Sequence, residues 1–301
     1  MRALLEPGVF TSAPVRGALI IGAVTAVLSA VVGVFTVIRG QSFAGHALTD
    51  VATTGGSAAF YFGLTPLAGF VTSGVLGAGA MSAIGVERVR QRDLATGIVL
   101  GAATGLAALF LYLDTTASAA TGSTQQILFG SIFSLSAATV SVVSAVSVAT
   151  LIVVAFIHRP LLLSSLSPEL ASARGVSVRV VSLVFLLALA LAVGLSSVAI
   201  GSILSTALLI GPAAAALRVT RRVASAIVAA CALGVAATWL GILFAYDSFY
   251  WFPSHRALPA SFFIVTIAFA FYLFTRLPFA VRRSERPGTR EATRRTNDRG
   301  A

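Results

Sequence analysis

Nine apolar runs, separated by charged or turn-forming residues, dominate this 301-residue chain. A run of about 20 residues, wound as an α-helix that rises about 1.5 Å per residue, matches the roughly 30 Å hydrocarbon core of a bilayer. The runs lie near residues 17–38, 43–63, 65–86, 94–113, 137–157, 180–197, 200–217, 223–245 and 259–277. They predict an all-α, polytopic membrane protein with eight or nine transmembrane helices.

The composition agrees with this class, since 57% of the residues are hydrophobic and only 10% are charged, too few to cover a soluble domain of this length. The first run has 22 uncharged residues and exceeds the core of a signal peptide, so we expect a retained span. The predicted organisation is an N-terminal segment (1–16), a transmembrane domain (17–277) and a disordered, basic, lipid-facing cytoplasmic tail (278–301). The single cysteine, Cys231, excludes a disulfide framework.

Arginine supplies all 21 basic residues, and the chain has no lysine, so it cannot bind ATP through a P-loop. These arginines are spread over short loops and the tail without an aromatic-rich basic patch, so no nucleic-acid binding is predicted. With nine crossings, 18 of them fall on one side, namely 39, 88, 90, 92, 159, 174, 179, 218, 221, 222 and eight from 276 to 299. The positive-inside rule then predicts a cytoplasmic C-terminus and an external N-terminus.

His46 and Asp50 lie four residues apart inside an apolar part of the chain. A helix places both on one face, where an imidazole and a carboxylate can hold a divalent cation. Ionisable groups at membrane depth usually mark an ion or substrate path, although a buried pair that only fixes helix geometry is the alternative. Asp93 is a further candidate, but it follows Arg92 and fits a solvated N-cap or an ion pair.

Several other residues carry expectations of structure rather than of chemistry. Asp114 and Asp247 fall at outer helix ends, where we expect exposure. Gly55-Gly56 and Gly211-Pro212 interrupt apolar runs, so the sequence predicts broken helices there. Gly97, Gly101 and Gly105 form a small-residue stripe that we expect to pack within the chain. No Gly-x-Ser-x-Gly or His-Glu-x-x-His motif occurs, and the chain is not expected to be an enzyme.

The connector between the fifth and sixth runs contains Ser167-Pro168-Glu169-Leu170-Ala171-Ser172-Ala173-Arg174-Gly175-Val176. Proline in a first turn and glycine after a short polar stretch predict a helix of one or two turns on the cytoplasmic side.

This segment resembles the coupling helix in the membrane subunits of bacterial zinc, manganese and iron ABC importers. The shared residues are Ser167, Pro168, Glu169, Ala171, Gly175 and Val176. The resemblance continues in Leu128-Phe129-Gly130, in Asp93 with Gly97-Ile98, in residues 198–216 around Gly201, Gly211 and Pro212, and in Tyr246-Asp247 before Pro259. The matches span about residues 17 to 277.

Two positions depart from that family. The family usually reads Gly-Asp-x-Leu-x-His where this chain has Gly45-His46-Ala47-Leu48-Thr49-Asp50, so the acid and the imidazole have exchanged places. Ser131 stands where the family often has aspartate. Zinc accepts both ligand types whereas manganese favours oxygen, so the identity of the metal stays open.

The resemblance implies a plasma-membrane permease that imports zinc, manganese or iron and holds no permanent cofactor. It implies a cytoplasmic ATP-binding subunit into which residues 167–176 insert as a coupling helix, an extracytoplasmic substrate-binding protein and a homodimer. A metal chelate or another small solute is an alternative cargo. A proton-coupled secondary transporter that uses His46 and Asp50 as a relay is an alternative from another class.

Overall fold

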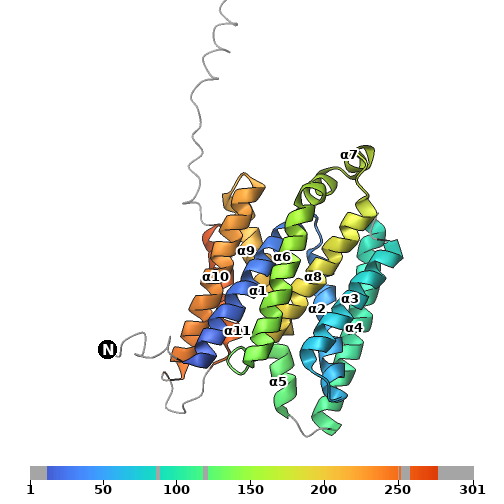
Figure 1. Cartoon of the computed structure of the whole chain (residues 1–301). Coiled ribbons are helices and arrows are strands. Elements are labelled where there is room, and N and C mark those ends of the chain that lie inside the picture. The colour runs from blue at the N-terminus through green and yellow to red at the C-terminus, as the bar shows by residue number, and fades with distance from the viewer. Residues whose placement is uncertain (1–11, 86–88, 118–120, 250, 252–257, 277–301) are drawn as a thin grey trace, which may run out of the picture.

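The computed structural model describes residues 12–85, 89–117, 121–249, 251 and 258–276, and every regular element in these ranges is a helix (Figure 1). The helices are α1 (Ala13–Ile38), α2 (Ser42–Tyr61), α3 (Pro66–Gly85), α4 (Val89–Ala117), α5 (Thr121–Phe129), α6 (Ala137–Leu166), α7 (Pro168–Ala173), α8 (Val178–Ile200), α9 (Ser202–Val219), α10 (Val223–Ser248) and α11 (Ala260–Phe274). Each predicted run corresponds to one helix, so the all-α polytopic fold is confirmed. The tail at 278–301 lies outside the described residues.

Seven helices in the described part of the chain are long and apolar enough to cross a membrane: α1, α3, α4, α6, α8, α9 and α10. α11 has the same apolar character but only 15 residues. α2 is long enough, but its Thr, Ser, His and Asp side chains make it too polar to meet the same criterion. Because lipid does not suit these polar side chains, they require another explanation.

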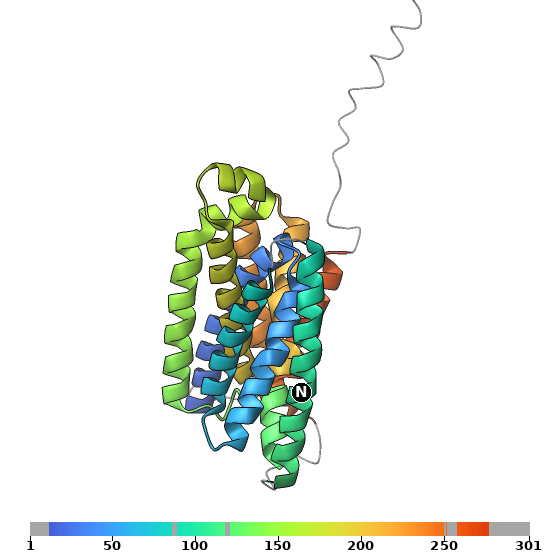
Figure 2. The ribbon, with the colours of Figure 1, turned by 90° about the vertical axis from the view of Figure 1, so that its right-hand side faces the viewer.

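The bundle has two distinct ends, and Figure 2 shows α7 at one and α5 at the other. We call them the α7 end and the α5 end. Arg39, after α1, bonds to the last turn of α6 and the first turns of α8, and Arg218, in the last turn of α9, lies over the Tyr272 ring near the end of α11. The α7 end thus gathers the ends of α1, α6, α9 and α11.

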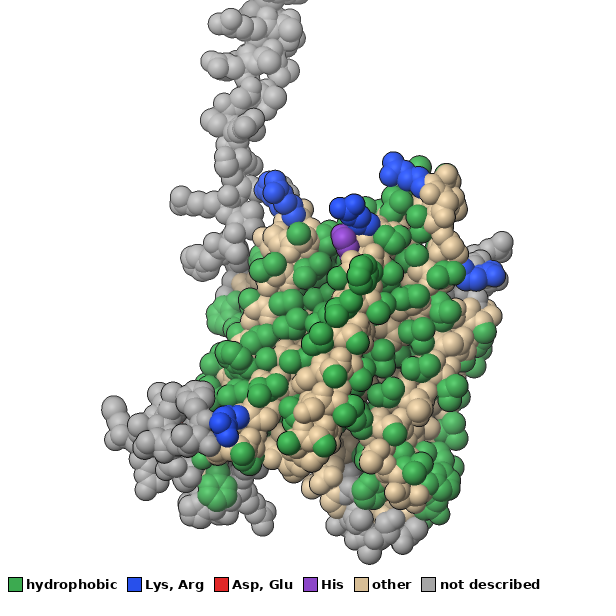
Figure 3. Space-filling view, viewed as in Figure 1, with side chains coloured by type: hydrophobic (Ala, Val, Ile, Leu, Met, Phe, Trp, Pro, Cys, Tyr) green, Lys and Arg blue, Asp and Glu red, His purple; other side chains and the backbone are tan. Residues whose placement is uncertain are grey.

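Basic side chains follow the same division, as the upper edge of the space-filling view shows (Figure 3). The arginines with described side chains at or near the α7 end are 39, 159, 174, 179, 218, 221, 222 and 276. Arg16, in the first turn of α1, lies toward the α5 end. The wall between is largely apolar, so the described part of the molecule agrees with the predicted charge asymmetry.

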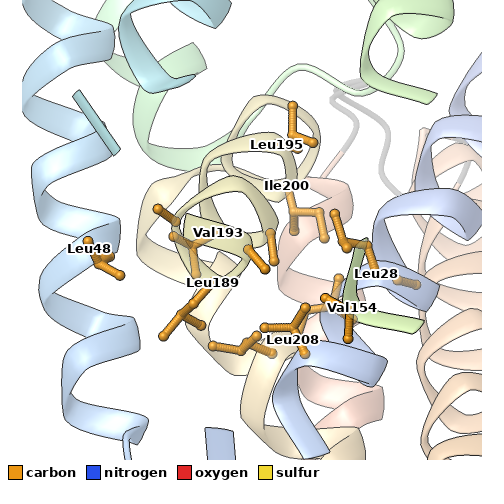
Figure 4. Close-up of a cluster of buried hydrophobic side chains, with 14 of the residues drawn as sticks. Leu28, Leu48, Val154, Leu189, Val193, Leu195, Ile200 and Leu208 are labelled. Atoms are coloured by element: carbon orange, nitrogen blue, oxygen red, sulfur yellow. The ribbon is translucent and has the colours of Figure 1, made fainter. Parts of the chain in front are cut away.

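The core lies where α1 and α8 cross the centre of the bundle. α1 packs against α6, α8, α9 and α10, and α8 packs against α1, α2, α3, α6 and α9. Figure 4 shows Leu28, Leu189 and Ile200 among the buried side chains that fill the space between these helices. Leu and Ala favour helices, and their mixture of sizes allows close interhelical packing.

Many of the hydroxyl groups inside the helices bond locally, although those of Ser29, Ser147 and Ser261 are buried without a partner. Thr25 donates to the Ile21 carbonyl at 2.7 Å, Thr36 to Val32 at 2.9 Å, and Ser197 to Val193 at 2.7 Å. Each bond reaches back four residues to a carbonyl of the same helix, which removes the cost of an unpaired hydroxyl in an apolar environment. Polar residues in these helices therefore do not by themselves mark a site.

The predicted helix breaks at Gly55-Gly56 and at Gly211-Pro212 are wrong, because α2 and α9 continue through both positions. A Cβ on Gly55 would collide with the Ser73 hydroxyl and the Gly69 carbonyl of α3, so this glycine allows two helices to approach closely. Pro212 is buried and its ring lies near Gly234 of α10. Neighbouring helices hold α9 continuous despite the missing N–H.

The actual reversal lies at Gly201, where α8 ends and α9 begins at a φ of +93°. Gly130, after α5, has a φ of +76°, and the two glycines meet backbone to backbone. A Cβ on Gly130 would collide with the Ala199 carbonyl, and one on Gly201 with the Leu128 carbonyl. Both positions need glycine for its left-handed backbone and for its lack of a side chain. The sequence reasoning did not predict α5, whose nine residues are too few to read as a span.

Candidate functional site

α2 carries the predicted pair of side chains. It packs between α3 and α4 and also contacts α8 and α9. His46 is exposed in this chain, and Asp50, one turn further along, is half-buried. Both residues belong to one continuous helix, so the spacing that the sequence indicated places them on one face. That face opens on the outer wall of the bundle rather than into its core.

Asp50 is tied to α4. Its Oδ2 accepts a hydrogen bond from the Thr104 hydroxyl at 2.5 Å, and one turn away Thr54 donates to the Ala103 carbonyl at 2.8 Å. Hydrogen bonds to a charged acceptor are roughly twice as strong as neutral ones. α2 and α4 are thereby held together where the carboxylate lies, and the Thr104 oxygen stands beside it.

A third contact fixes the other side of α2. The hydroxyls of Thr49 and Thr206 lie 3.1 Å apart and join α2 to α9. Thr49 is buried, whereas the next residue, Asp50, reaches the α4 side. This pair of anchors sets the rotation of α2 about its axis and so fixes the direction in which the His46 and Asp50 face points.

The pair does not amount to a complete metal centre in one chain. Among the described residues, no group of three or more His, Cys, Asp and Glu side chains lies close enough to hold a metal ion. Asp93 lies in the first turns of α4, but its side chain is outside the described residues. A cation at this face therefore needs ligands from water, from the Thr104 hydroxyl or from another chain.

Asp114 differs from expectation. It lies near the α5 end of α4, is 0% exposed, and has neither carboxylate oxygen in a hydrogen bond. Its position near a helix end had indicated exposure, so this prediction is wrong. Asp247 agrees better with the predicted exposure, because its Oδ2 accepts a hydrogen bond from Trp251 Nε1 at 3.0 Å in an exposed setting. His158, in α6, is exposed, and His255 lies outside the described residues.

The predicted short helix is present as α7. The Ser167 hydroxyl accepts a bond from the Leu170 N–H, and Pro168 occupies the first turn. Gly175 ends the helix at a φ of +76°, and the N–H groups of Gly175 and Val176 bond to the carbonyls of Ser172 and Ala171, each at 3.0 Å. These two bonds form a Schellman motif, which only a residue tolerant of positive φ completes without strain.

α7 presents most of its side chains outward. Ala171 is buried and anchors it, while Pro168, Glu169, Leu170 and Arg174 are exposed. Leu170 is 59% exposed and Leu166, at the end of α6, is 73% exposed, although both lie at the arginine-rich end. Apolar side chains projecting among charges are typical of a protein contact.

The sequence matches the ABC 3 transport family over residues 13–277. The chain therefore belongs to this family and is a transmembrane permease of an ATP-binding-cassette transport system, which confirms the class that the motifs suggested. It is 29% identical to the manganese import system permease protein ScaB of Streptococcus gordonii over 77% of this chain and 82% of that protein. It is 26% identical to a probable iron transport system membrane protein of Haemophilus influenzae over 89% of this chain and 97% of that protein.

A solved structure shares this fold. A chain of PsaBC from Streptococcus pneumoniae, determined in complex with Fab, superposes with a TM-score of 0.72 at 26% sequence identity. The match covers 89% of this chain and 92% of that chain. The arrangement of helices described above is thus shared with that solved chain.

Proposed function

We propose that this chain is the permease of an ATP-driven importer for a divalent metal, with manganese(II) as the first cargo to test. The α7 end faces the cytoplasm and binds the ATPase subunit, and the α5 end receives metal from an external binding protein. The proposal is supported by the names of the relatives, by the arginines at the α7 end and by the His46 and Asp50 face. The observation that carries it is the Asp50 carboxylate, which accepts a hydrogen bond from Thr104 on the face of α2 that also exposes His46.

The exposed polar face argues for two copies of the chain. Lipid would solvate neither His46 nor Thr104, both of which are exposed here. Beside them, a Cβ added at Gly97, Gly101 or Gly105 of α4 would meet nothing within 4 Å. The expectation that this stripe packs within the chain is therefore wrong. A second copy that packs against α2 and α4 would cover the polar groups and enclose a path between the two chains.

Such a dimer would also supply the missing ligands. Two chains bring two carboxylates, two imidazoles and two threonine hydroxyls to one path, which is enough for a transient cation site. Oxygen ligands suit manganese, while imidazole suits zinc and iron as well. The carboxylate with its adjacent hydroxyl favours manganese, in agreement with the names of relatives such as ScaB.

Uptake of manganese(II) into proteoliposomes that contain the permease and its ATPase tests the proposal. His46→Ala and Asp50→Ala should each lower uptake per folded molecule at least tenfold, because either change removes both ligands of one type from the dimer. His158→Ala is the matched control, since this exposed histidine bonds only to the Ala155 carbonyl of its own helix. Unchanged uptake in both α2 variants would show that the pair is not part of the metal path. Competition by zinc, iron or a metal chelate with manganese(II) uptake identifies the cargo.

The exchanged order of the two ligands can be tested directly. His46→Asp combined with Asp50→His restores the order usual in the family and keeps both ligand types. The imidazole then replaces the carboxylate beside Thr104, so the hydrogen bond to a charged acceptor is lost. We expect partial uptake, above that of either alanine variant and below that of the unmodified chain. Uptake no higher than in the alanine variants would show that the position of each ligand along α2 matters more than the presence of both ligand types.

A further inference from the structure

Arg39 joins segments that are far apart in the sequence. It follows α1 as the C-cap residue and is half-buried at the α7 end. Its Nη1 donates to the hydroxyls of Ser164 and Ser165 at 3.2 Å each, and its Nη2 donates to Ser182 at 2.8 Å. Its guanidinium carbon lies 5.3 Å from the centre of the Phe185 ring. A planar fork with five N–H donors suits this set of partners, whereas a lysine ammonium would not.

The partners of Arg39 hold the base of α7. Ser164 and Ser165 lie in the last turn of α6, and Ser182 and Phe185 lie in the first two turns of α8. α6 and α8 are the two helices from which α7 projects (Figure 1). Both serines of α6 donate their own protons to the Leu161 carbonyl, so their lone pairs are free to accept from the guanidinium. One side chain therefore joins the end of α6 to the start of α8, the two helices that hold α7.

The two residues that follow Arg39 in the chain, Gly40 and Gln41, form the turn that leads to α2. Gly40 has a φ of +61°, its N–H bonds to the Val37 carbonyl at 3.1 Å, and the Gln41 N–H bonds to Thr36 at 2.9 Å. These bonds form a second Schellman motif, and Arg39 Nε donates to Gln41 Oε1 at 3.3 Å. Gln41 is 2% exposed. The turn is thus fixed by hydrogen bonds on both sides, and α2 begins at the next residue.

We propose that Arg39 is a positioning residue that transmits movement of α7 to α2 and so links ATP hydrolysis to the His46 and Asp50 face. The inference rests on the proposed function, because it assigns α7 to the ATPase and α2 to the metal path. A displacement of the α6 and α8 ends changes the bonds of Arg39, and the rigid turn carries that displacement into the first turn of α2. Two discrete arrangements of such a bonded cluster are what coupling between distant sites requires.

Two fluorescent reporters test this link. Cys231→Ala gives a cysteine-free chain, in which Ser172→Cys labels α7 and Phe43→Cys labels the first turn of α2, both at exposed positions. In the permease bound to its ATPase, ATP with vanadate should change the fluorescence at both positions. With Arg39→Gln added, the α7 signal should persist, the α2 signal should fall at least fivefold, and manganese(II) transported per ATP should fall at least tenfold.

The controls separate this link from general damage and from the proposed function. Arg218→Gln removes an arginine at the same end that lies over Tyr272 and should leave both signals unchanged. If Arg39→Gln is not recovered folded, Ser164→Ala with Ser182→Ala removes acceptors of the same cluster and should give the same loss at α2. A normal α2 signal in these variants overturns the role of Arg39 alone. No response at α7 in the unmodified chain overturns the proposed function, and the inference with it.

Discussion

At the scale of single residues, Asp50 and Asp114 differ in whether the carboxylate has a hydrogen-bond partner. Asp50 is half-buried and accepts a bond from Thr104, whereas Asp114 is fully buried with both oxygens unpaired. An unpaired buried polar group costs about 1–3 kcal/mol of stability. The first acid therefore has a hydrogen-bond partner in another helix, while the second imposes a cost on the fold.

That cost can be measured. Asp114→Leu replaces the carboxylate with an apolar group of comparable size, so we expect a gain of about 1–3 kcal/mol in the free energy of unfolding. Thermal unfolding of the purified chain in detergent would show it as a higher midpoint. Asp247→Leu is the control, because it removes an acceptor that is used by Trp251 and should not stabilise the chain. A lower midpoint for Asp114→Leu would mean that the carboxylate has a partner that stabilises the fold.

At the scale of helices, close approach between backbones holds the centre of the bundle together. A Cβ on Gly33 of α1 would collide with the Leu209 carbonyl of α9 and lie 3.3 Å from the Ala213 Cβ. We expect Gly33→Ala to lower the free energy of unfolding by about 1–3 kcal/mol, since added volume forces packed helices apart. Gly79→Ala is the matched control, because a Cβ there meets nothing within 4 Å and alanine favours a helix. Equal stability of the two variants would contradict this packing.

α7 allows a second prediction at this scale. Gly175→Val places a β-branched residue at a φ of +76° and should displace the end of α7, costing about 1–3 kcal/mol locally. We expect a permease that inserts normally but loses most of its ATPase binding, as measured by copurification. Gly63→Val is the matched control, because it places the same strain at a φ of +73° in the turn between α2 and α3, at the α5 end and away from α7. Retained ATPase binding in Gly175→Val would remove α7 as the contact.

At the scale of the whole molecule, the arginine distribution gives the bundle a direction. Eight arginines with described side chains lie at or near the α7 end, and Arg16 lies toward the α5 end. On the positive-inside rule, we propose that the α7 end faces the cytoplasm. A reporter fused after Arg299 should be active in the cytoplasm, and one inserted after Leu64, in the turn between α2 and α3, should be external. The reverse pattern would invert the proposed direction of transport.

The sequence predicted the helices well because membrane depth sets their length and composition. It predicted α7 because proline, serine and glycine act within a few residues of one another. It failed at three places: Gly211-Pro212 does not break α9, which packs against its neighbouring helices, Asp114 is buried, and α5 is too short to stand out. The Asp50 bond to Thr104 joins residues 54 positions apart, so local pattern could not have indicated it.

The contact between Gly130 and Gly201 has a mechanical consequence. Because the two turns touch through their backbones, no flexible side chain lies between them to absorb a relative displacement. α5 and the turn between α8 and α9 must therefore shift together in any movement of the α5 end. The α5 end then has fewer independently moving parts than its number of helices suggests.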